Sequence, residues 1–217
     1  AAILKRTASP LATACDASVC GAGIVDAAAA VADQAPAPPL PVMTATKSPS
    51  IAGTPTIDRD LTGDAGTWSA TATLATRWLR DNTPIAGATS ATHRTTTSDV
   101  GHVLTFEVTA SRTGYAPATV RSAALRIKQG ALRVHTSPSV SGTRKVGHRL
   151  SGKTGSWTPA PSLTRHWLRD GRPIVRATGS TYRLTKADRG HRVQLRVTAA
   201  RTGYTTKVVL SPADRVR

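Results

Sequence analysis

The two cysteines, Cys15 and Cys20, are the first candidates for chemistry in this chain. They lie in CDASVC with four residues between them. A structural zinc site needs four ligands, and neither a Cys-x-x-Cys motif nor a spaced histidine pair accompanies these two thiols. A local disulfide therefore fits better than zinc, and a persistent bridge would indicate an oxidising compartment. Two buried free thiols are the alternative.

The histidines offer no second chemical centre. All six are scattered along the chain, and none forms a pair at the spacing of metal ligands on a helix. His102 and His191 each follow a glycine, in DVGH and DRGH, and act either as pH-sensitive loop contacts or as ordinary turn residues. The sequence predicts no metal site and no cofactor.

Basic charge is the strongest chemical signal, and it is unevenly distributed. The chain has 29 basic and 12 acidic residues, a net charge of +17. Residues 132–217 carry +15 of this, with eighteen basic and three acidic residues, whereas residues 43–131 carry +3 and residues 1–42 carry −1. Such a density of charge creates a sizeable positive field.

The candidate anion-binding residues are arginines interleaved with strand residues in the last third of the chain. They are Arg165, Arg169, Arg172, Arg176, Arg183, Arg189, Arg192 and Arg196. Candidate partners are anionic cell-wall polymers, nucleic acid and acidic lipid head groups. No nucleic-acid motif is present and aromatic residues are sparse, which argues against nucleic acid as a specific partner. Coding bias in a GC-rich genome is the alternative explanation for the arginines.

The elements that position these residues recur at an offset of 89 residues. Trp68 and Trp157 are 89 apart, as are Trp78 and Trp167. SPSIAGT pairs with SPSVSGT, and VTASRTGY pairs with VTAARTGY. Roughly two positions in five are identical across the matched stretch, which indicates a duplication. The domains expected are repeat 1 over residues 43–131 and repeat 2 over residues 132–217.

Each repeat has a β pattern. VLTFEVTA and VQLRVTAA alternate apolar and polar residues, so Val193, Leu195 and Val197 should face one side of a strand and Arg196 the other. The Asp-Gly pair at 170–171 predicts a hairpin. We expect a mainly β fold of two tandem sandwiches after a short helical N-terminal segment.

The arrangement resembles tandem immunoglobulin-like (Ig-like) repeats at the C-termini of secreted actinobacterial proteins. Its motifs are the tryptophan in WLRD, the YRLTKADRG corner and the late GY pair. The resemblance implies a core containing Trp78, Trp167, Tyr115 and Tyr204. Repeat 1 departs from the pattern with HRTTTSDVG, and both repeats lack inter-sheet cysteines. Trp68 and Trp157 are candidates for either the core or sugar stacking.

The N-terminal residues 1–33 resemble the C-terminal edge of a secreted subtilisin-like (S8) serine peptidase domain. The likeness rests on the cysteine loop followed by GAGIVDAAAAV, which predicts a strand at Ile24 and Val25 and a helix over Ala27–Ala30. The alternative is a generic alanine-rich terminal helix. Residues 34–42 form an Ala/Pro linker. Because the chain opens on Ala1 without a signal region, we expect an upstream segment to be missing.

No catalytic residue is expected in this chain, since none of the Asp, His and Ser motifs of a subtilase is present. Two hypotheses follow. The chain is either the C-terminal accessory region of a secreted peptidase, or a non-enzymatic extracellular repeat protein for adhesion or structure. Both predict secretion, with possible attachment to the cell wall, and neither predicts a membrane span.

Overall fold

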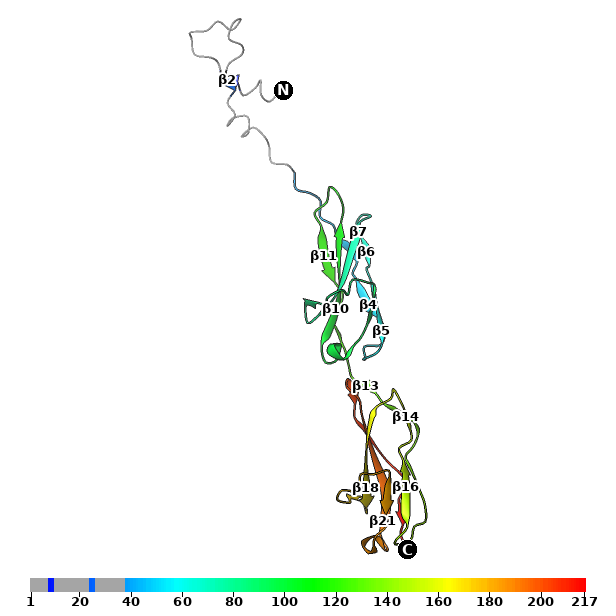
Figure 1. The fold of residues 1–217 in the computed structure, drawn as a ribbon. Coiled ribbons are helices and arrows are strands. Elements are labelled where there is room, and N and C mark those ends of the chain that lie inside the picture. Colours follow the sequence, from blue (N-terminus) through cyan, green and yellow to red (C-terminus); the bar gives the residue numbers. More distant parts are fainter. Residues whose placement is uncertain (1–7, 10–23, 26–37) are drawn as a thin grey trace, which may run out of the picture. The chain divides into compact units, whose positions relative to one another are not determined.

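The computed structural model describes residues 8–9, 24–25 and 38–217 and is mainly β (Figure 1). The chain divides into two units, Ala1–Pro41 and Val42–Arg217. In the first, the structure describes β1 (Ala8–Ser9) and β2 (Ile24–Val25), which pair antiparallel and include the strand expected at Ile24. The expected helix and both cysteines lie outside the described residues.

The second unit contains both repeats. Repeat 1 comprises β3 (Ala45–Lys47), β4 (Ser50–Ala52), β5 (Asp60–Asp64), β6 (Thr67–Trp68), β7 (Thr73–Arg80), β8 (Thr83–Pro84), β9 (Thr92–Arg94), the 3-10 helix η1 (Thr97–Asp99), β10 (Val103–Ser111), β11 (Ala118–Arg121) and β12 (Leu125–Arg126). Repeat 2 comprises β14 (Arg133–Thr136), β15 (Ser139–Ser141), β16 (Arg149–Lys153), β17 (Ser156–Thr158), β18 (Ser162–Arg169), β19 (Arg172–Pro173), β20 (Thr181–Arg183), η2 (Lys186–Asp188), β21 (Arg192–Ala200), β22 (Tyr204–Thr205), β23 (Lys207–Leu210) and β24 (Asp214–Arg215). The short strand β13 (Gly130–Ala131) lies just before the expected boundary at residue 132 and pairs with β22 of repeat 2.

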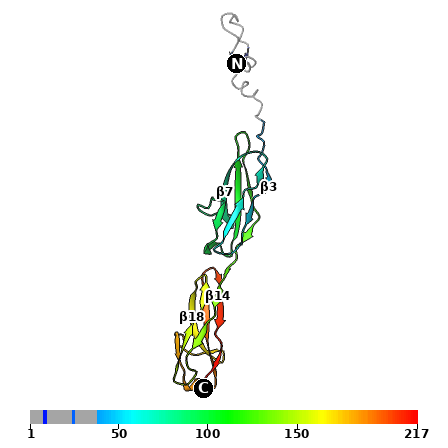
Figure 2. The same cartoon turned by 90° about the vertical axis from the view of Figure 1, so that its right-hand side faces the viewer.

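Both repeats are Ig-like sandwiches of the same topology. In repeat 1 the larger sheet has the order β11-β10-β7-β8, with β12 also on β10, and it faces the sheet β4-β5-β9. In repeat 2 the corresponding sheets are β19-β18-β21-β23, with β24 also on β21, and β15-β16-β20. The central strands β7 and β18, labelled in Figure 2, pair along their whole length with the longer strands β10 and β21. The expected mainly β fold is thus confirmed for the described residues.

Each core is centred on one tryptophan. Trp78 and Trp167 are fully buried, and each indole N–H donates to a backbone carbonyl, that of Ser90 at 2.9 Å and that of Gly179 at 3.0 Å. These bonds satisfy the one polar atom that a buried indole brings into a core. On β21 the burial pattern alternates as expected, with Val193, Leu195 and Val197 inside.

The other aromatic residues differ in their degree of burial. Trp157 is buried, and Trp68 is partly buried against the core of repeat 1. Tyr204 is half-buried on the core of repeat 2, and its hydroxyl donates to Asp58 at 2.8 Å. Tyr115, which was expected in the core, is half-buried but lies outside the core cluster of repeat 1. These positions leave the two additional tryptophans poorly placed to stack on a sugar.

Candidate functional site

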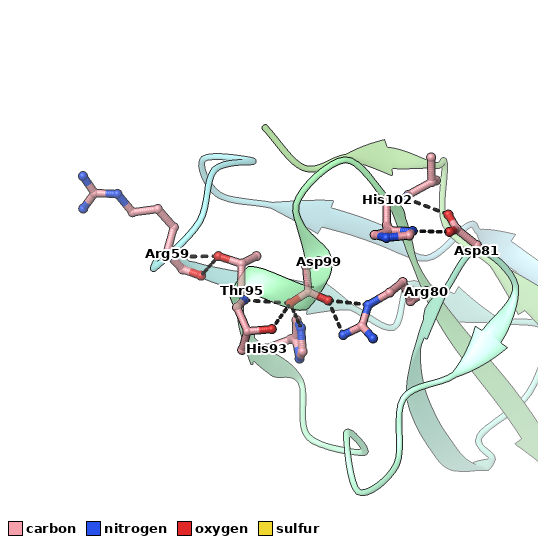
Figure 3. A network of polar contacts seen from close by, with 9 residues as sticks. Arg59, Arg80, Asp81, His93, Thr95, Asp99 and His102 are labelled. Atoms are coloured by element: carbon pink, nitrogen blue, oxygen red, sulfur yellow. Dashed lines mark hydrogen bonds and ion pairs between the residues drawn. The ribbon is translucent and has the colours of Figure 1, made fainter. Parts of the chain in front are cut away.

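A buried carboxylate lies at the centre of a polar network in each repeat. In repeat 1 the side chain of Asp99, on η1, is fully buried. It accepts hydrogen bonds from Arg80 at 2.6 Å and 2.8 Å and from the backbone N–H of Thr96 at 2.7 Å, and His93 lies at 3.2 Å (Figure 3). Burial alone would raise the pKa of Asp99, but these bonds outweigh it and hold the pKa below its ordinary value.

The counterpart in repeat 2 is Asp188, with a tyrosine in place of the histidine. The Asp188 carboxylate accepts hydrogen bonds from Arg169 at 2.7 Å, from the backbone N–H of Thr185 at 2.7 Å and from the hydroxyl of Tyr182 at 3.0 Å. Burial would raise the pKa of Asp188, but the hydrogen bonds lower it overall. Burial and the bond to Asp188 raise the pKa of Tyr182. Arg169 lies on β18 and Tyr182 on β20, so the network ties η2 to both sheets and its role is structural.

Two exposed His–Asp pairs have the geometry of half of a catalytic triad. Nδ1 of His102 lies 2.5 Å from Asp81, and Nδ1 of His191 lies 2.5 Å from Asp170. A hydrolytic triad also needs a nucleophile on the other ring nitrogen. Among residues 38–217 no serine hydroxyl is hydrogen-bonded to either histidine, and no cluster of three metal-ligating side chains occurs among the described residues. The Asp81 and Asp170 carboxylates instead accept from the backbone N–H groups of Val103 and Arg192, which ties the turns after β7 and β18 to the starts of β10 and β21.

The eight candidate arginines are not gathered on one face. Arg169 is engaged by Asp188, and Arg183 lies on β20 in the smaller sheet. Arg165 lies on β18 and lines a hollow beside Lys153, while Arg196 is on the outer face of β21. The remaining four are exposed at β19, the following turn, the end of η2 and the start of β21: Arg172, Arg176, Arg189 and Arg192.

Comparison of the repeats shows a charge reversal at the centre of the larger sheet. In repeat 1 the buried Glu107 pairs with Arg77 and, at 2.7 Å, with Arg121 on the neighbouring strands. Burial would raise the pKa of Glu107, but the two arginines lower it overall. The matching residue in repeat 2 is Arg196. Its cross-strand neighbours are His166 and Leu210.

The charge of Arg196 therefore has no acidic residue beside it across the strands, whereas Glu107 forms ion pairs with two arginines. The Arg196 Nε is buried and has no hydrogen-bond partner among the described residues, and the same is true of the Arg165 Nε. A buried donor without an acceptor costs free energy that an anionic ligand would recover.

A second reversal lies on the smaller sheet. Asp60 and Arg94 are directly opposite each other on β5 and β9, with an ion-pair distance of 3.4 Å. In repeat 2 the same register places Arg149 opposite Arg183. Like charges opposite each other destabilise a pair of strands. Arg149 was not among the candidate anion-binding residues, although the offset of 89 residues matches it to Asp60.

Comparisons with known proteins concern the fold of the chain. A scan against protein-family models finds no match, and no curated protein matches significantly. Among solved structures, the chain is similar to three N-terminal domains of the bacteriophage RB49 Highly Immunogenic Outer Capsid protein (Hoc), with a TM-score of 0.34 and 14% identity over 76% of this chain and 59% of that chain.

Two further solved structures are similar. Murine CEACAM1b matches with a TM-score of 0.31 and 14% identity, covering 78% of this chain and 99% of that one. The tandem Ig repeats of Dlar match with a TM-score of 0.26 and 12% identity, covering 79% and 99%.

Proposed function

We propose that the chain is the C-terminal accessory region of a secreted subtilisin-like serine endopeptidase, in which repeat 2 holds the peptidase on anionic cell-wall polymer and repeat 1 acts as a spacer. The resemblance of residues 1–33 to the edge of a peptidase domain supports the first half. The described residues contain no helix that is long and apolar enough to cross a bilayer. The chain contributes binding and spacing, and an upstream domain contributes the catalytic triad.

The observation that supports polyanion binding is the contrast between two copies of one scaffold. Repeat 2 carries +15 and repeat 1 carries +3. Two of the acidic positions that repeat 1 uses in cross-strand ion pairs, Asp60 and Glu107, are arginines in repeat 2. Coding bias would act on both copies equally, so it does not account for this contrast.

Binding of the full chain to immobilised heparin or wall material, measured as a function of salt, tests this proposal. We expect affinity to fall steeply with salt, because each neutralised anionic group releases about one counterion. Binding that persists at ~1 M salt, where the Debye length is ~3 Å, would contradict an electrostatic mechanism. The peptidase half is tested in the upstream coding sequence, where a G-T-S-x-[AS] nucleophile motif is expected.

A further inference from the structure

The outer face of the sheet β15-β16-β20 carries positive charge and hydroxyl groups. Along these strands Val140, Leu150 and Tyr182 point inward, and the alternate residues are exposed. We call the exposed set the basic strip. It consists of Ser139, Ser141, Arg149, Ser151, Lys153, Thr181 and Arg183. None of these seven side chains is acidic or aromatic.

On the same face of repeat 1 the charged side chains form ion pairs. Its seven matching residues are Ser50, Ala52, Asp60, Thr62, Asp64, Thr92 and Arg94. Asp60 pairs with Arg94, and Asp64 accepts from Lys47 at 2.7 Å. In repeat 2 the two aspartates are replaced by Arg149 and Lys153, so a face with a charge of −1 becomes one with +3.

An unsatisfied donor lies at the Lys153 end of the strip. Lys153 and Arg165 line one hollow with a volume of about 380 Å³, together with Ser139. The Arg165 Nε is buried without a partner among residues 38–217. Its counterpart in repeat 1, Thr76, is satisfied by donating to the carbonyl of Thr89 at 2.6 Å. At this end of the strip repeat 2 therefore has a buried donor without an acceptor among the described residues, whereas the matching donor in repeat 1 has one.

We propose that the basic strip is the binding face for a linear polyol phosphate polymer, a site that rests on the proposed function. A phosphodiester presents two oxygens, which can accept from Arg149 and Arg183 together because these residues are directly opposite each other on β16 and β20. Lys153 lies four residues along β16 from Arg149, which is about 13 Å at the rise of a strand. A ligand that reaches both ends must carry more than one anionic group.

The remaining side chains of the strip favour a polyol over a nucleic acid. Its four hydroxyl residues can exchange hydrogen bonds with polyol or sugar hydroxyls. Single-stranded nucleic acid is bound through stacking on aromatic side chains, and the strip contains none.

The test uses the full chain, poly(glycerol phosphate) as the probe, and identities taken from repeat 1. The double variant Arg149→Asp, Lys153→Asp reproduces Asp60 and Asp64 on the same scaffold and gives Arg183 an opposite charge across the strands. We expect it to stay folded and to lose about tenfold or more in affinity at ~100 mM salt. The matched control, Lys207→Asp with Arg215→Asp, changes the charge equally on the larger sheet and should retain binding within about twofold.

Three outcomes would overturn the site. If both double variants lose affinity equally, binding depends on the net charge of the chain. The chain then binds polyanions, but not specifically through the basic strip. If single-stranded DNA or polygalacturonate binds the wild-type chain as tightly as the phosphate polymer, the strip does not select a polyol phosphate. If the wild-type chain binds none of these at ~50 mM salt, the proposed function fails together with the site. Restored binding on introducing Asp60→Arg and Asp64→Lys into the strip variant would support the site independently.

Discussion

The Asp188 carboxylate is fully buried and accepts hydrogen bonds from Arg169, Tyr182 and Thr185. Removing it leaves a partly buried guanidinium and a tyrosine hydroxyl without their acceptor. We expect Asp188→Ala to destabilise repeat 2 by about 3 kcal/mol, as for other broken buried pairs. Urea denaturation measures the change. The exposed Asp170→Asn is the control and should have a small effect, and equal losses for both variants would contradict a structural role of the buried network.

The buried carboxylates also predict a dependence of stability on pH. The pKa values of Asp99 and Asp188 are held below the ordinary value of 3.8 by their hydrogen bonds, despite the opposing effect of burial. A carboxylate with a lowered pKa in the folded state contributes stability that is present above pH 3.8 and is lost as the pH falls through the lowered value.

Urea denaturation between about pH 5 and pH 2 checks this dependence, because that window begins above the ordinary pKa and extends well below it. We expect the free energy of unfolding to fall steadily as the solution is acidified. The variant Asp99→Asn, Asp188→Asn should show a flatter profile than the wild type. Identical slopes for the two proteins would show that other carboxylates, such as Glu107, control acid stability.

At the scale of elements, close contact between the sheets depends on glycine in the second strand of each smaller sheet. A Cβ atom on Gly152 would lie 2.8 Å from Leu195 Cδ2 and 3.1 Å from Trp167 Cζ2. Gly152→Ala should therefore destabilise repeat 2 by about 1–3 kcal/mol through overpacking. Thermal unfolding checks this, with the neighbouring exposed Ser151→Ala as a control expected within about 0.5 kcal/mol. An unchanged melting temperature for Gly152→Ala would mean that the sheets can separate at little cost.

The strands could be predicted from the sequence, but their register could not. Alternation in VQLRVTAA places Val193 and Leu195 on the inner face, because the period of a strand is fixed by its geometry. Which residue lies opposite Arg196 depends on pairing between segments far apart in the sequence, and alternation says nothing about that pairing. The pairing of Glu107 with two arginines emerges only from the structure, whereas its replacement by Arg196 follows from the offset of 89 residues.

Only part of the candidate site could be predicted from the sequence. Arginine density selected Arg183 but overlooked Arg149 and Lys153, because their strand is short and polar and its apolar alternation rests on Leu150 and Gly152. Comparing the charges of the two repeats position by position identifies both, since aspartates occupy those positions in repeat 1. The disulfide between Cys15 and Cys20 stays a prediction.

At the scale of the whole molecule, the two repeats have separate cores that share no buried residue. The first contains Trp78 and Phe106, and the second contains Trp167 and Leu195. Contacts between the repeats are few by comparison and include the Tyr204 hydroxyl on Asp58 and Ile57 against Gly203. Each core is built by its own pair of sheets, so each repeat should be a cooperative unit of its own.

The last prediction concerns how these two units unfold in the full chain. Asp99→Ala should lower the melting temperature of one calorimetric transition, and Asp188→Ala should lower that of the other. The two variants change equivalent residues in different cores, so their effects in the double variant should add to within about 0.5 kcal/mol. A single transition that moves as one in both variants would show that the contacts at Asp58 and Ile57 couple the repeats into one folding unit. In that case the Arg149→Asp, Lys153→Asp variant would have to be checked for altered stability of repeat 1 before its loss of binding is assigned to the basic strip.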